Sequence, residues 1–144
     1  MIEQDTVRLL RECDAGVKMG VSSIDDVVDY VSSEKLKSLL TDCKAEHRKL
    51  DSEIHENLNR YDDDGKEPAA MAKGMSWIKT NVMLAVNESD STIADLMTDG
   101  CNMGVKSLNK YLNKYVAADE KSKDIAKRLI NLEEKLAVDI RAYL

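Results

Sequence analysis

The sequence predicts an all-α protein, a bundle of four long helices in one domain. Strand-forming aromatic residues are scarce, with no Phe and one Trp in the chain, and a single Pro leaves long stretches free to be helical. Apolar residues recur every three or four positions over most of the chain, which is the spacing of one helix face. The 144 residues are enough to bury one core, so we expect a single domain over 1–144.

The first two helices are expected over 6–31 and 34–61. Between them stands Ser33, a residue type that caps helix N-termini by accepting a hydrogen bond from a free backbone N–H. The second helix ends at the acidic turn Asp62–Gly65, because Gly stops helices. This turn lacks the ligand spacing of an EF-hand, so it is not expected to bind calcium.

Three further helices follow the turn. Pro68 suits the first turn of a shorter helix over 68–86, where its missing N–H costs nothing. After a polar break, helices are expected over 91–115 and 119–143.

A short internal repeat links the first long helix to the third. Residues 16–24 and 100–108 share the pattern G-x-x-M-G-V-x-S-[IL], and a weaker similarity aligns 50–58 with 136–144. The chain therefore divides into two pseudo-repeated helix hairpins.

These hairpins span 6–61 and 91–143, and the 68–86 helix joins them. A connection of that length can cross the whole bundle, so the second hairpin need not continue a simple up-and-down path.

Each copy of the repeat carries two glycines four residues apart on its apolar stripe, namely Gly16, Gly20, Gly100 and Gly104. Gly costs about 1 kcal/mol relative to Ala inside a helix, so these positions need a reason. Helix packing is one interpretation, because removing Cβ lets two helix backbones approach closely. A backbone that leaves room for a ligand is the other.

The two hairpins, the helical crossover and the repeated G-x-x-M-G-V-x-S-[IL] pattern resemble the ferritin-like superfamily. Within it they resemble small bacterial bundles known only as domains of unknown function. The resemblance covers nearly the whole chain and implies a ferritin-like four-helix bundle with one long crossover. Such a fold does not fix an activity.

The ligand set of ferritin-like di-iron proteins is missing from the sequence. Those proteins take a Glu from each of two helices and a Glu-x-x-His motif from each of the other two. Here Lys44 stands three residues before His47, and Ser52 three residues before His55. We therefore expect neither di-iron chemistry nor catalytic residues, and we do not expect an enzyme.

A degenerate metal site around His47 is the alternative. His47 falls on the apolar stripe of its helix, with Cys43 and Asp51 four residues to either side, and the weaker similarity aligns it with Glu133. Cys and His at this spacing can bind zinc. The competing interpretation is a core histidine that is hydrogen-bonded to a neighbour.

Composition excludes two classes of partner and indicates a compartment. The net charge is −6 and the chain lacks a basic cluster, so nucleic acid is not an expected partner. It also lacks an apolar run long enough to span a membrane. Three widely spaced cysteines without a CxxC pair indicate reduced thiols in a bacterial cytoplasm.

Two functions remain open. The first is a non-enzymatic structural or protein-interaction module without a cofactor, which associates with itself or with a protein partner. Its apolar surface would include Tyr111, Tyr115 and Tyr143. The second is a metal-binding or oxidative-stress-related protein that holds iron or zinc around His47.

Overall fold

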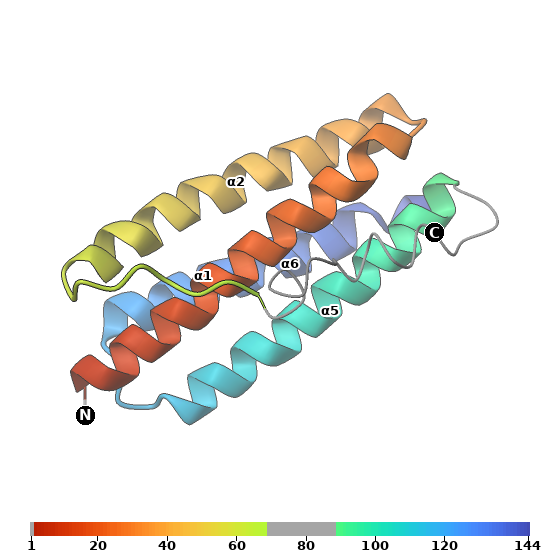
Figure 1. The fold of residues 1–144 in the computed structure, drawn as a ribbon. Coiled ribbons are helices and arrows are strands. Elements are labelled where there is room, and N and C mark those ends of the chain that lie inside the picture. The colour runs from red at the N-terminus through yellow and green to blue at the C-terminus, as the bar shows by residue number, and fades with distance from the viewer. Residues whose placement is uncertain (1, 69–88) are drawn as a thin grey trace.

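The protein is a bundle of long α-helices lying side by side (Figure 1). The structure is a computed structural model that describes residues 2–68 and 89–144, and these residues contain no strand. The helices are α1 (Ile2–Val27), α2 (Glu34–Asn59), α5 (Asp90–Lys114) and α6 (Glu120–Asp139), with 3-10 turns η1 (Val28–Tyr30) and η2 (Arg141–Tyr143). The all-α prediction is confirmed, while the helix predicted over 68–86 lies outside the described residues apart from Pro68.

Helix bounds agree closely with the sequence pattern except in the first helix and at the end of the last. α6 ends at Asp139 instead of residue 143, and η2 follows it. α1 begins at Ile2 instead of residue 6, and it ends at Val27 instead of residue 31 because η1 follows. α2 begins at Glu34 as predicted. The hydroxyl of Ser33 accepts a hydrogen bond from the backbone N–H of Leu36 (3.2 Å), so its capping role is confirmed.

The two helix hairpins pack together with α2 and α5 running in the same direction (Figure 1). The start of α5 lies beside the start of α2, because the Asp90 carboxylate accepts hydrogen bonds from the backbone N–H groups of Ser32 (2.8 Å) and Ser33 (3.0 Å). The chain therefore leaves α2 at one end of the bundle and enters α5 at the other.

The opposite end of the bundle has a matching pair of contacts. Asp5 accepts a hydrogen bond from the backbone N–H of Ala117 (3.1 Å), and the Thr6 hydroxyl accepts one from Asp119 (2.8 Å). Asp119 in turn caps α6 through its own side chain. Each hairpin thus supplies hydrogen-bond acceptors to the helix start of the other.

The core consists of two apolar clusters arranged along the bundle. One contains Leu50 of α2 and Ile130 of α6, and the other contains Leu40 and Leu136 of the same helices. Each fully buried Leu or Ile contributes roughly 1.5–3 kcal/mol to folding. None of the described helices has both the length and the hydropathy needed to cross a membrane.

Candidate functional site

A buried ion pair lies between the two apolar clusters, at the centre of the bundle. His47 of α2 and Glu133 of α6 approach to 2.9 Å between Nε2 and Oε1, and the His47 side chain is 1% exposed. The other ring nitrogen of His47, Nδ1, lies 2.8 Å from the carbonyl oxygen of Cys43 and 3.5 Å from its sulfur. Three of the four residues predicted to bind metal therefore meet here.

Both ring nitrogens of His47 act as donors in this arrangement. A carbonyl oxygen only accepts, so Nδ1 carries a proton, and the Glu133 carboxylate accepts from Nε2. Burial alone would lower the pKa of His47, but the contacts with Cys43 and Glu133 raise it to about 10. His47 is therefore an imidazolium at neutral pH, and it has no lone pair to offer a metal ion.

Gly20 of α1 makes room for the imidazole ring. A Cβ atom at this position would lie 2.9 Å from two ring atoms of His47, closer than such atoms can approach. Gly104 of α5 borders Glu133 instead, and a Cβ there would lie at an ordinary contact distance of 3.6 Å. His47 and Glu133 thus contact each other, as their alignment in the weaker sequence similarity suggested. Each of them also borders a glycine of the repeat.

The fourth predicted ligand, Asp51, lies in a different cluster between α1 and α2. Its carboxylate lies against that of Asp14, which is completely buried, and His55 completes the group. One ligand-type atom from each of the three residues lies within 4.8 Å of the others. Nε2 of His55 is 2.8 Å from Oδ1 of Asp14 and 3.6 Å from Oδ2 of Asp51.

Several contacts fix the orientation of the Asp14 carboxylate. Its Oδ2 atom accepts a hydrogen bond from the backbone N–H of Lys66 (2.9 Å) and pairs with the Lys18 ammonium (2.9 Å). Lys18 also pairs with Glu67. Gly65 has a φ of 93°, and any side chain there would overlap Asp14. The chain after α2 therefore packs its backbone directly onto the cluster.

Two carboxylate oxygens of this cluster are buried without a hydrogen bond. They are Oδ1 of Asp14 and Oδ1 of Asp51. The first is close to His55 but without hydrogen-bond alignment. Burial raises the pKa of Asp51, and the facing Asp14 carboxylate raises it further, to about 7. Burial also opposes ionisation of Asp14, but its contacts with Asp51, Lys18 and Lys66 outweigh this and lower its pKa.

This cluster has the chemistry of a cation site. Ligand atoms around one Zn²⁺-like ion, at about 2.0–2.2 Å from the metal, are separated from each other by roughly 3–3.5 Å. Nε2 of His55 lies 2.8 Å from the Asp14 carboxylate and 3.6 Å from that of Asp51, so these distances fall on either side of the expected ligand–ligand separation. A shallow hollow of about 340 Å³ borders Asp51 and Lys18 and connects the cluster to solvent.

Sequence reasoning missed Asp14 and His55 as members of this site. Asp14 only flanks the apolar stripe of the first helix, and His55 stands one step off that of the second. The one available signal was the Asp51–His55 spacing of four residues, which places both side chains on one helix face.

The second half of the chain has no counterpart of the cluster. The repeat aligns Asp14 with Thr98, and the weaker similarity aligns Asp51 with Ala137 and His55 with Arg141. Packing of a hairpin in this bundle therefore does not require the carboxylate pair.

Removal of one facing carboxylate is expected to stabilise the metal-free protein. The folded-state pKa of Asp51, about 7, lies above the ordinary value of 3.8. Protonated Asp51 therefore favours folding at low pH, and this contribution to stability is lost as pH rises towards 7. In chelator-treated protein at pH 8, Asp51→Asn should raise the free energy of unfolding by about 1–2 kcal/mol.

Urea unfolding at pH 5 and pH 8 checks this prediction. The matched control is Asp42→Asn, at an exposed carboxylate of the same helix, for which no gain is expected. A lower stability of Asp51→Asn than of wild type at pH 8 would contradict the interpretation of a strained carboxylate pair.

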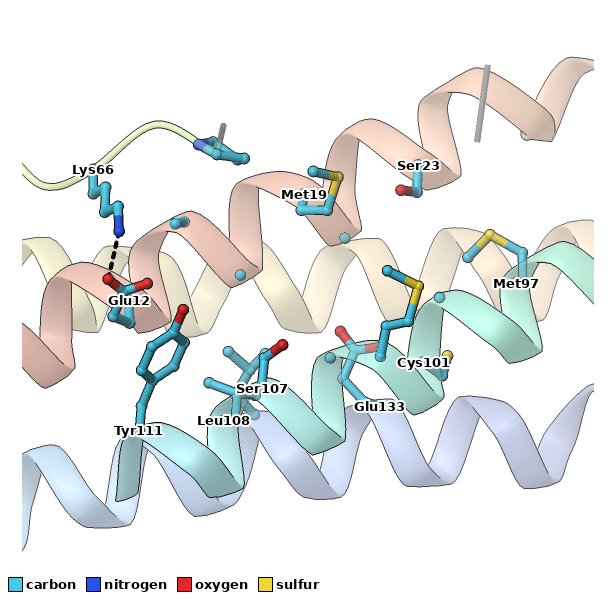
Figure 2. A pocket seen from close by; sticks show the side chains of 18 residues that line it. Glu12, Met19, Ser23, Lys66, Met97, Cys101, Ser107, Leu108, Tyr111 and Glu133 are labelled. Atoms are coloured by element: carbon cyan, nitrogen blue, oxygen red, sulfur yellow. Dashed lines mark hydrogen bonds and ion pairs between the residues drawn. The ribbon is translucent and has the colours of Figure 1, made fainter. Parts of the chain in front are cut away.

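A cavity of about 390 Å³ lies between α1 and α5, away from the Asp14 cluster (Figure 2). All four glycines predicted to serve helix packing line it, two from each helix. A Cβ at Gly16 would make an ordinary contact of 3.5 Å with Leu129. The glycines of the two repeats thus border a shared space.

Comparison of the chain with protein-family models, with curated proteins and with solved structures gives no match.

Proposed function

We propose that this protein binds a divalent metal ion through Asp14, Asp51 and His55. One observation carries the proposal: the cluster holds two buried carboxylate oxygens without hydrogen bonds, Oδ1 of Asp14 and Oδ1 of Asp51, and one ligand-type atom from each of Asp14, Asp51 and His55 lies within 4.8 Å of the others. A cation would neutralise the facing carboxylates, whose close approach otherwise costs stability. The site replaces the one that we expected around His47, and it shares only Asp51 with it.

The ligand types narrow the choice of metal. Two carboxylates and one imidazole favour Zn²⁺, Fe²⁺ or Mn²⁺ over Ca²⁺, which prefers an all-oxygen shell, and over Cu⁺, which prefers sulfur. Lys18 and the backbone N–H of Lys66 contact the outer oxygen of Asp14. Such outer contacts keep a metal-binding carboxylate in one orientation.

We further propose that the bundle belongs to the ferritin-like class and acts without catalysis. The parallel direction of α2 and α5 supports a single crossover between the hairpins. The proposed metal position, between α1 and α2, departs from the di-iron centre of that class. A bacterial cytoplasm stays the compartment that composition predicts.

Association with a second copy or with another protein also stays a prediction. Of the three tyrosines that we expected on the protein's apolar surface, Tyr115 is buried in the core, and Tyr111 and Tyr143 are half-buried. The large apolar side chains exposed among the described residues are instead Tyr30, Met103, Val116, Val138 and Leu144.

Metal titration of chelator-treated protein tests the proposed function. Wild type should bind one equivalent of Zn²⁺ or Mn²⁺ in equilibrium dialysis. At a free metal concentration of 100 times Kd, its free energy of unfolding should increase by about 2.7 kcal/mol. Asp14→Asn and His55→Gln should lose both effects.

His47→Gln is the control that separates the two candidate sites. Because the bonds of both His47 ring nitrogens go to Cys43 and Glu133 and not to the Asp14 cluster, this variant should keep the metal-induced increase. An increase that survives His55→Gln but disappears in His47→Gln would place the metal at the central pair. Absence of a stoichiometric metal in wild type would exclude the proposed function.

A further inference from the structure

The cavity between α1 and α5 has mostly apolar walls (Figure 2). Met19 of α1 and Met97 of α5 both line it, and Leu108 and Leu129 contribute further apolar surface. Methionine side chains adapt to ligands of varied shape because they are unbranched and polarisable. The volume of about 390 Å³ lies in the range of small-molecule sites.

The glycines widen this space on both sides. At Gly104, the three heavy atoms nearest to an added Cβ would all belong to Glu133, at 3.6 Å or more. The position therefore has room for a side chain, and close helix contact does not require glycine there. Because Gly104 has no side chain, part of the cavity stays free. This agrees with the interpretation that the glycines of the repeat leave room for a ligand.

A carboxylate reaches the cavity from α6, in addition to the hydroxyls of Ser23, Ser107 and Tyr111 that line it. This carboxylate, Glu133, projects between α1 and α5, where the Cys101 thiol hydrogen-bonds to it (Figure 2). The residue is 9% exposed, and its Oε1 atom is bonded to His47. Its other carboxylate oxygen, Oε2, lies on the side of Gly104 and the cavity.

Charges that line the cavity are already paired within the protein. Glu133 is neutralised by the His47 imidazolium, and Glu12 at one end of the cavity is paired with Lys66 (Figure 2). Among the described residues that line the cavity, an ionic ligand would therefore meet no unpaired opposite charge to compensate for its loss of water, whereas a neutral ligand loses little hydration energy.

We infer that this cavity binds a neutral, largely apolar small molecule that carries one hydrogen-bond donor. The apolar part of the ligand lies between the methionines, and its N–H or O–H group donates to Oε2 of Glu133. The inference is independent of the proposed metal site, because none of the three proposed metal ligands lines the cavity.

A fluorescent probe of this class tests the inference. N-phenyl-1-naphthylamine is neutral, has two apolar ring systems and a single N–H, and becomes bright when it leaves water. It should bind to wild type with a stoichiometry of one. The N-methylated analogue, which lacks the donor, should bind about fivefold more weakly, as expected for loss of one hydrogen bond of about 1 kcal/mol.

Two variants locate the probe. Gly104→Met places a side chain in the cavity and should weaken binding at least tenfold, while Lys106→Met adds the same side chain at an exposed position of α5 and should leave binding unchanged. Ser107→Trp, at another lining position, is a second blocking variant should Gly104→Met fail to fold. Circular dichroism reports folding in each case.

Equal binding of the probe to wild type and to a folded blocking variant would overturn the inference, and so would an absence of stoichiometric binding to wild type. Metal titration of the same samples separates this outcome from failure of the proposed function. His55→Gln should lose the metal effect and keep the probe.

Discussion

Replacement of Glu133 by alanine is expected to lower the free energy of unfolding by about 3–5 kcal/mol at pH 7, because a buried cation loses its partner. The imidazolium of His47 is 1% exposed, and Glu133 is the carboxylate that pairs with it among the described residues. Urea unfolding measures the loss. Glu134→Ala is the matched control, since Glu134 is exposed on the same helix and should change stability by no more than about 0.5 kcal/mol.

The same pair sets a pH dependence that checks its charge state. The folded-state pKa of His47, about 10, lies above its ordinary value of 6.5, so the folded protein binds the proton more tightly. The resulting stability is complete below pH 6.5 and is lost as pH rises towards 10. Stability should therefore fall between pH 6.5 and 8.5 in wild type, and much less in Glu133→Ala.

Measurement within that interval avoids the buried thiols. Burial raises the pKa of Cys13 to about 12 and also raises that of Cys101, so both contribute a slope of the same sign once unfolded thiols begin to ionise near pH 9. Equal slopes in wild type and Glu133→Ala would show that His47 is not held as a cation by this carboxylate.

Gly20→Ala is expected to destabilise the protein by about 1–2 kcal/mol, although alanine is the better helix former by about 1 kcal/mol. The new Cβ would lie 2.9 Å from the His47 ring, which is fixed by bonds at both nitrogens. The ring must either be overpacked, at about 1–3 kcal/mol, or give up a charged hydrogen bond, at about 1.5–3 kcal/mol.

Two other glycines of the repeat provide the comparison. At Gly16 and Gly104 an added Cβ makes ordinary contacts of 3.5 and 3.6 Å, so their alanine variants should be neutral or gain up to about 1 kcal/mol. Thermal unfolding of the three variants distinguishes these cases. Equal stability of Gly20→Ala and Gly16→Ala would show that the imidazole ring moves aside easily.

Sequence patterns predicted the helices well because local rules determine them. Helical spacing of apolar residues located α2 and α6, and the capping preference of Ser33 located the start of α2 to the residue. The end of α1 was predicted too late. There the following backbone N–H groups of Ser32 and Ser33 bond to Asp90, a residue distant in sequence, so the helix ends for a tertiary reason.

The candidate site was predictable only in part. The alignment of His47 with Glu133 pointed to their meeting, because equivalent positions of two packed hairpins approach one another at the bundle centre. The grouping of Asp14 with His55 depends on how α1 is rotated against α2 and on how the chain around Gly65 folds back. Neither quantity is encoded in the spacing of residues along one helix.

The exchange of capping contacts between the hairpins has a consequence for folding cooperativity. Asp90 completes the start of α2, while Asp5 and Thr6 bond the turn that leads into α6. If one hairpin opened alone, the other would keep its own helices but lose acceptors for backbone N–H groups at a helix start. Opening of one hairpin therefore costs hydrogen bonds at both ends of the bundle. This coupling favours a single all-or-none unfolding transition, in which neither hairpin folds as an autonomous unit.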